Sequence, residues 1–170
     1  MPQRIIIVED DKNLSQILTK EFQEKNFDVV CATKISEIPD NQIFNYAVID
    51  MRLSEGDFGL KALELLKNIN PQIKAIVLSG YGSIASAVEA VKLGAIDYLT
   101  KPASFEQIFQ SLTEQKIASS EAEFKRLSLS EAEHQYIDFV LTKNNGNISQ
   151  TAKDLGLHRQ SLQRKLKKYT

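Results

Sequence analysis

The chain has 170 residues, of which 42% are hydrophobic, and its formal net charge is −1. This length exceeds that of a typical domain, so one domain with a small appendage is expected. No apolar run approaches the ~20 residues of a membrane span, and the chain starts without a signal-peptide pattern, which indicates a cytoplasmic protein with no membrane partner. Cys31 is the only cysteine, which excludes an intramolecular disulfide. We expect it to be a small hydrophobic residue on a buried second strand.

The first two thirds of the sequence alternate apolar runs of strand length with segments of helical spacing. Strands are expected to start near Ile5, Phe27, Tyr46, Ala75 and Ala95. Three apolar stripes with helical spacing separate them: Leu14, Ile17, Leu18 and Phe22; Leu60, Leu63, Leu66 and Ile69; and Ile84, Ala87, Val88 and Val91. A further helical segment, at 35–38, is short and stops at a proline. Repeated strand–helix units predict an α/β fold with a five-stranded parallel, doubly wound sheet.

Charged residues follow three of these strands at the point where each ends. The cluster Glu9-Asp10-Asp11 follows the first strand, Asp50 closes the third, and Lys101 follows the fifth. These strand ends meet at one edge of a parallel sheet, where ligands bind in open α/β folds. Carboxylates pushed together repel one another, and a few oxygen ligands suit Mg²⁺. The pattern predicts a carboxylate that accepts a phosphoryl group, with Asp11 serving instead as the N-cap of the next helix.

These positions together resemble the receiver domain of two-component response regulators, over residues 1–112. The resemblance implies a flavodoxin-like (CheY-like) fold and a phosphoryl group received on Asp50 from a sensor histidine kinase. It implies that Mg²⁺ is bound by Asp10, Asp50 and the backbone carbonyl of Arg52, and by Glu9 through a water.

The same resemblance assigns the remaining residues of the receiver site. It implies that Ser79 is the switch hydroxyl, Tyr98 the switch aromatic and Lys101 the site lysine, with a cis bond before Pro102. Such a protein is a phosphoacceptor with Mg²⁺-dependent self-phosphorylation and dephosphorylation chemistry, and not a turnover enzyme.

The charge is divided unevenly along the chain. Residues 1–112 carry a net charge of −4 and residues 113–170 a net charge of +3, with six Lys or Arg and one Asp in 153–170. An acidic module joined to a basic end predicts two separate tasks, with nucleic acid as the partner of the basic end.

Three helices are expected in the last 44 residues. Ser130 and Glu133 form a capping box for the first, and Asn147 with Gln150 caps the second. A tight turn at Gly156 then leads into a third, basic helix, which is the helix-turn-helix arrangement. The apolar residues of the first helix are Tyr136, Ile137, Val140 and Leu141. The third helix is expected to run from about His158 to Lys168, with Leu162, Leu166 and Tyr169 facing the core. Its outward residues are expected to be Arg159, Gln160, Gln163, Arg164 and Lys167.

This end resembles the DNA-binding part of the Fis protein and, across nearly the whole chain, the regulators of the RegA/PrrA/ActR type. The resemblance implies that Arg159 reads a base of double-stranded DNA. It assigns contacts to the DNA backbone to Asn147, Ser149, Ser161, Arg164 and Lys165.

The resulting division is a receiver at 1–112, a linker at 113–126 and a Fis-type helix-turn-helix domain at 127–170. The linker has no proline, unlike that of the similar regulators, and is expected to be helical. We expect a transcriptional regulator that forms a homodimer when it is phosphorylated. Two alternatives are a Fis-like nucleoid-architecture protein, which predicts an incomplete acidic site, and a phosphorelay intermediate without a DNA role, against which the basic helix argues.

Overall fold

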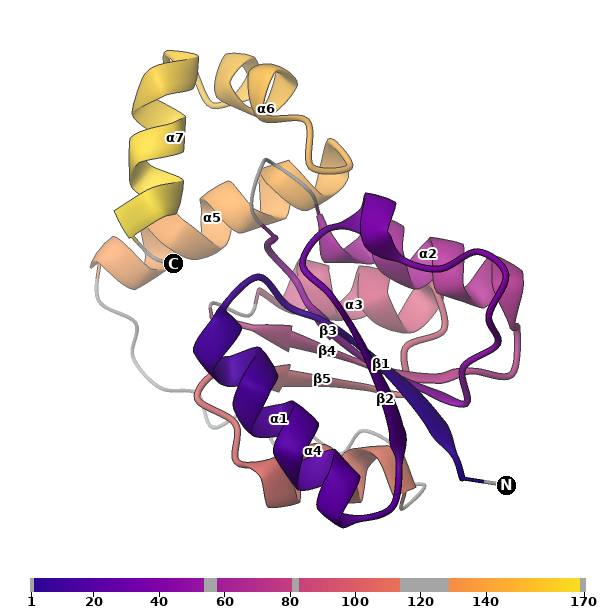
Figure 1. Cartoon of the computed structure of the whole chain (residues 1–170). Coiled ribbons are helices and arrows are strands. Elements are labelled where there is room, and N and C mark those ends of the chain that lie inside the picture. The colour runs from indigo at the N-terminus through magenta and orange to yellow at the C-terminus, as the bar shows by residue number, and fades with distance from the viewer. Residues whose placement is uncertain (1, 54–57, 81–82, 114–128, 169–170) are drawn as a thin grey trace.

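The computed structural model describes residues 2–53, 58–80, 83–113 and 129–168. A parallel five-stranded sheet with the strand order β2-β1-β3-β4-β5 forms the centre of the larger module (Figure 1). The strands are β1 (Arg4–Val8), β2 (Asp28–Ala32), β3 (Tyr46–Asp50), β4 (Lys74–Ser79) and β5 (Asp97–Thr100). The predicted doubly wound sheet is therefore confirmed.

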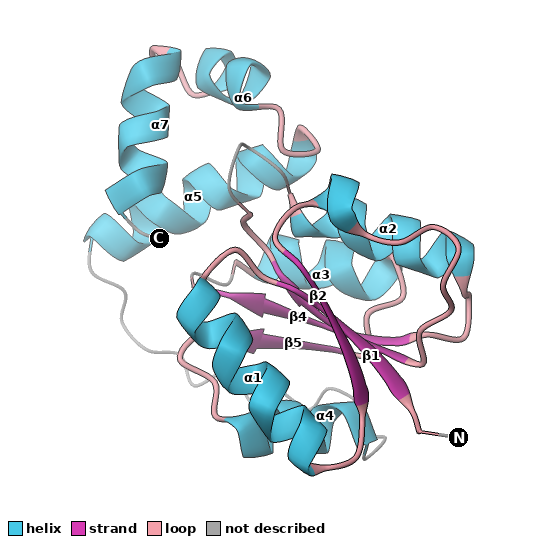
Figure 2. Cartoon of the chain, in the orientation of Figure 1, coloured by secondary structure: helices cyan, strands magenta, loops and turns pink. Residues whose placement is uncertain are grey.

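Helices cover both faces of this sheet, as Figure 2 shows. The first face packs against α1 (Lys12–Glu24) and α4 (Phe105–Thr113), and the second against α2 (Gly59–Ile69) and α3 (Ile84–Lys92). The short segment expected at 35–38 forms only a 3₁₀ turn, Ile35–Glu37.

Alternate residues of the central strands enter the two cores. Ile5 and Ile7 pack with α1 and α4, whereas Ile6 and Val8 pack with α2. All four are fully buried, because a parallel sheet covered on both faces needs apolar side chains at consecutive positions.

Local signals in the sequence set several helix ends. The Asp11 carboxylate accepts hydrogen bonds from the backbone N–H groups of Asn13 and Leu14 at 2.8 and 3.2 Å, which confirms it as the N-cap of α1. Gly94 follows α3 with φ +94°, a conformation that favours glycine.

Burial in the receiver departs from the sequence pattern at two places. The apolar stripe of α3 is largely exposed: Ile84 is 81% exposed, while Ser86 and Ala90 are buried instead. The reason is that the polar side of α3 packs against a helix of the C-terminal module. Cys31 is also exposed, because β2 is an edge strand, and its sulfur lies 3.1 Å from the Thr19 hydroxyl.

The C-terminal module consists of α5 (Leu129–Lys143), α6 (Ile148–Asp154) and α7 (Arg159–Lys168). Ile137, Ala152 and Leu162 form its small core. The predicted helix-turn-helix is thus present, and the Asn147 side chain caps α6 by accepting from the N–H of Gln150 at 3.1 Å. The Gly156 turn between α6 and α7 has φ +65°.

Details of α5 differ from the predictions. The helix already includes Leu129, so Ser130 lies within it and is not its N-cap. The Glu133 carboxylate accepts from Lys165 at 2.7 Å, and Tyr136 is exposed. Tyr169 and the expected helical linker beyond Thr113 lie outside the described residues. Within the described ranges, no helix is both long and apolar enough to cross a membrane.

Candidate functional site

Three strand ends bring the predicted acidic site together. Glu9 directly follows β1, Asp50 is the last residue of β3, and Lys101 directly follows β5. The Lys101 ammonium donates to a Glu9 carboxylate oxygen at 2.7 Å and lies 3.0 Å from an Asp50 oxygen. One carboxylate oxygen from each of Glu9, Asp10 and Asp50 lies within 4.8 Å of the other two.

Burial and crowding change the protonation of these groups. Burial, followed by the negative charge of Asp50, raises the pKa of Glu9 to about 7. Burial also raises the pKa of Asp50, although the Lys101 ammonium acts in the opposite direction. Burial alone lowers the pKa of Lys101, but the two carboxylates outweigh it and raise that pKa. Three ionised carboxylates would hold more negative charge than one lysine neutralises.

This excess negative charge is the property that a divalent cation site needs. The Glu9, Asp10 and Asp50 side chains supply oxygen donors only, and the donors are close enough together to surround one small ion. Mg²⁺ prefers oxygen ligands, and it usually takes only a few of them from the protein and the rest from water. These residues therefore fit the predicted magnesium ion.

The end of β4 and the start of β5 place the two predicted switch residues beside the acidic site. Ser79 is buried at the end of β4, and its carbonyl accepts from the backbone N–H of Lys101 at 2.7 Å. Burial raises the pKa of Tyr98 to about 12, and its hydroxyl lies beside those of Ser79 and Ser86. The Lys101–Pro102 peptide bond is cis, as expected.

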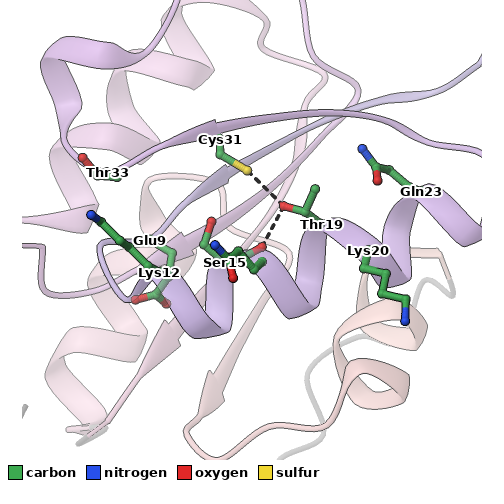
Figure 3. Close-up of a pocket in the computed structure, with 9 residues that line it drawn as sticks. Glu9, Lys12, Ser15, Thr19, Lys20, Gln23, Cys31 and Thr33 are labelled. Carbon is green, nitrogen blue, oxygen red and sulfur yellow. Dashed lines mark hydrogen bonds between the residues drawn. The ribbon is translucent and has the colours of Figure 1, made fainter.

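A shallow groove of about 350 Å³ runs from the acidic site along α1 (Figure 3). Glu9 lies at one end of it, and Lys12, Thr19 and Cys31 line its walls. The groove therefore lies between α1 and β2 and reaches the acidic site at Glu9.

The predicted DNA contacts lie on the outer surface of α6 and α7. Five of these side chains are exposed: Asn147, Ser149, Arg159, Ser161 and Arg164. Lys165 is half-buried and paired with Glu133. Leu162 is buried and Leu166 half-buried, and Gln163 is half-buried rather than fully outward. The structure thus leaves the basic side of α7 accessible.

A second cluster of polar side chains was not predicted from the sequence. It joins Arg52 of the receiver to Asp138 of α5, and it also includes Ser83, Ser86 and Thr142. One sequence signal was available: Asp138 and Thr142 are spaced four apart and directly follow the apolar residues Ile137 and Leu141, so they share one face of the helix beside an apolar pair.

Comparisons with known proteins agree with this geometry. The family model "Response regulator receiver domain" matches residues 5–113, and the model "Bacterial regulatory protein, Fis family" matches residues 128–169. The chain is a two-component response regulator. It resembles the RegA/PrrA/ActR type throughout, since the photosynthetic apparatus regulatory protein RegA of Rhodobacter capsulatus is 36% identical over 96% of this chain and 90% of its own length.

Two further relatives support the assignment. The acid tolerance regulatory protein ActR of Rhizobium meliloti (strain 1021) is 36% identical over 96% of this chain and 86% of its own length. A crystal structure of a Burkholderia pseudomallei response regulator, with a phosphorylated aspartic acid, a calcium ion and citrate, is 33% identical. It aligns with a TM-score of 0.64 over 95% of this chain and 97% of its own. This response regulator is therefore a DNA-binding transcription regulator, and its partners are a histidine kinase and DNA.

Proposed function

We propose that Asp50 is the phosphoacceptor of this response regulator. The observation that carries the proposal is the cluster in which the Asp50 carboxylate lies 3.0 Å from Lys101 and beside Glu9 and Asp10. An Asp50 oxygen attacks the donor phosphorus and forms a P–O bond, while the bond from phosphorus to the donor nitrogen or oxygen breaks and the leaving group keeps its electron pair. The relative with a phosphorylated aspartic acid supports this assignment.

The chain's own residues orient this reaction. The backbone N–H of Arg52 and the Lys101 ammonium both donate to the Asp50 carboxylate. Lys101 is placed to neutralise a transferred phosphoryl oxygen, and Ser79, at the end of the adjacent strand, to donate to another. Tyr98 would then move toward the space that Ser79 vacates.

Mg²⁺ is the proposed cofactor. Asp10, Asp50 and the backbone carbonyl of Arg52 would hold it, with Glu9 acting through a water. When bound, the ion neutralises charge on the phosphoryl group and the carboxylates. Intact-mass measurement after incubation with acetyl phosphate tests the reaction: one phosphoryl group is expected per chain with Mg²⁺ and none with EDTA. Equal phosphorylation in EDTA would exclude the proposed role of the metal.

Asp10→Ala is expected to weaken Mg²⁺ binding by about tenfold or more, since even removal of an outer partner of a metal ligand has about that effect. Asp11→Ala is the matched control, because its carboxylate caps α1. That change should cost about 1 kcal/mol of folding stability and leave Mg²⁺ affinity nearly unchanged. Calorimetric titration with Mg²⁺ measures both, and equal losses of affinity would remove Asp10 from the ligand set.

For DNA binding, Arg159 is the proposed base-reading residue, because it is exposed at the start of α7. Arg159→Ala is expected to cost about 1–3 kcal/mol at the specific site and to relax sequence preference. Lys165→Ala should instead weaken binding to all sequences and lower the salt slope by about one, as loss of a phosphate contact does. Titrations of specific and scrambled DNA at several salt concentrations separate the two. Equal losses on scrambled DNA would contradict the assigned role of Arg159.

One helix-turn-helix covers half a site, so we also propose that the phosphorylated protein binds DNA as a homodimer. The proposed pairing surface is the face formed by α3, β5 and α4, where Ile84, Val88 and Val91 are exposed.

The proposed division is a receiver at 1–112, a linker at 113–126 and a DNA-binding domain at 127–170. We propose that the protein acts in the cytoplasm, where DNA and the kinase's phosphoryl group are both available.

A further inference from the structure

The DNA-binding module packs directly against the receiver beside the phosphorylation site. Figure 1 shows α5 next to α3, and the two helices are in contact. Leu141 of α5 belongs to the same buried cluster as Met51 and Phe58 of the receiver. At Gly146, after α5, a Cβ atom would lie only 2.8 Å from Cβ of Phe58. The two modules therefore share a close-packed interface.

A buried carboxylate lies at the centre of this interface. Asp138 is 0% exposed, and one of its oxygens accepts from the Arg52 guanidinium at 2.6 Å. Its other oxygen accepts from the Ser86 hydroxyl of α3. The Thr142 hydroxyl lies 3.2 Å from that of Ser86 and donates to the Asp138 carbonyl at 2.8 Å. A buried charge is tolerated only while such partners stay in place, so Asp138 ties α5 to two separate segments of the receiver.

Each of these two receiver segments contacts a residue of the proposed phosphorylation site or of the switch pair Ser79 and Tyr98. Arg52 follows Asp50 by two residues, and its backbone N–H donates to the Asp50 carboxylate while its side chain reaches Asp138. Ser86 lies beside the buried Tyr98 hydroxyl, which in turn lies beside Ser79. One residue of the DNA-binding module thus connects to the phosphoacceptor on one side and to the switch pair on the other.

We propose that Asp138 is a positioning residue for the phosphoryl chemistry of Asp50, acting through Arg52 and Ser86. Docked α5 holds the Arg52 side chain in the interface and keeps Tyr98 covered, which stabilises the unphosphorylated arrangement and slows phosphoryl transfer. This inference rests on the proposed role of Asp50. Because coupling between two sites is reciprocal, phosphorylation weakens the docking of α5 by the same factor.

Docking does not cover the residues that are proposed to contact DNA. Arg159 and Arg164 are exposed in the docked arrangement, whereas Ile137, Asp138, Leu141 and other residues of α5 are buried. The interface occupies one side of α3, which is part of the proposed pairing face. Docking therefore acts on phosphoryl transfer through the Ser86 side of α3, and leaves the DNA-reading side of α7 free.

The test compares full-length Asp138→Asn with the wild-type chain. The amide has nearly the shape of the carboxylate but no charge to hold Arg52. With acetyl phosphate and Mg²⁺, followed by intact mass over time, the variant is expected to be phosphorylated about fivefold faster or more, the lower end of typical coupling between sites.

Amide hydrogen exchange of the unphosphorylated variant is expected to rise in α3 and α5 and to stay unchanged in β1 and β3. Glu133→Gln is the matched control, because that carboxylate lies on the same helix and pairs with Lys165, and its rate should equal that of the wild type.

A double-mutant cycle separates positioning through Arg52 from a general loosening of the chain. Arg52→Ala removes the partner, so adding Asp138→Asn to it should change the rate much less than Asp138→Asn does alone. Purely additive effects, or an unchanged or slower rate in Asp138→Asn, would overturn the proposal. If Asp138→Asn does not fold, Ser86→Ala provides the same comparison by removing the other partner. Absence of phosphorylation in the wild type would instead refute the role of Asp50.

Discussion

Asp50→Asn is expected to abolish phosphorylation by acetyl phosphate. The amide has no anionic oxygen with which to attack phosphorus, and no acyl phosphate forms from it. Substitution also removes one of the three carboxylates from the proposed Mg²⁺ site, so the remaining oxygens of Glu9 and Asp10 attract the ion less strongly. Intact mass after incubation with acetyl phosphate and Mg²⁺ should show no phosphoprotein.

Asp11→Asn is the matched control for this experiment. It also removes a nearby carboxylate, but asparagine caps a helix about as well as aspartate, so α1 and the acidic site should keep their structure. Its phosphorylation should remain close to that of the wild type. An Asp50→Asn protein that still gains a stable phosphoryl group would place the phosphoacceptor elsewhere.

The receiver site was predictable from the sequence because a parallel sheet puts the carboxyl ends of its strands at one edge. Glu9, Asp50 and Lys101 each follow an apolar run, and the structure brings all three into contact. Asp11 was recognisable for a local reason, since an aspartate before a helical stripe is an N-cap signal. Both inferences depend only on strand ends or on neighbours in the sequence.

Contacts between the modules were not predictable in the same way. The stripe of Ile84, Val88 and Val91 has the spacing of a core face, yet these residues are exposed because the Ser86 side of α3 is covered by α5. Periodicity shows which side chains share a face of a helix but not which face meets a partner more than 50 residues later in the chain. The exposure of Cys31 has a similar origin, because the position of β2 at the sheet edge is a property of the topology.

Gly59→Ala is expected to destabilise the receiver strongly. A Cβ atom at this position, the first residue of α2, would lie 2.1 Å from the Asp50 carbonyl oxygen and 3.0 Å from Cα of Met51. Both are backbone atoms at the end of a central strand, so neither can rotate away as a side chain would. We expect a cost of about 3 kcal/mol, the upper end of the usual range for overpacking, and a fall in the midpoint of thermal unfolding of roughly 6–12 °C.

Gly156→Ala separates this steric effect from the loss of glycine as such. Gly156 has φ +65°, and a Cβ atom there would have no neighbour within 4 Å. Its substitution should therefore cost only the left-handed backbone conformation, about 1–2 kcal/mol. Because Gly59 packs on the strand that ends in Asp50, its substitution should also slow phosphorylation by acetyl phosphate, whereas Gly156→Ala should not. Thermal unfolding of both variants, followed by circular dichroism, makes the comparison, and a Gly59→Ala protein no less stable than Gly156→Ala would show that α2 can move away from β3 without loss.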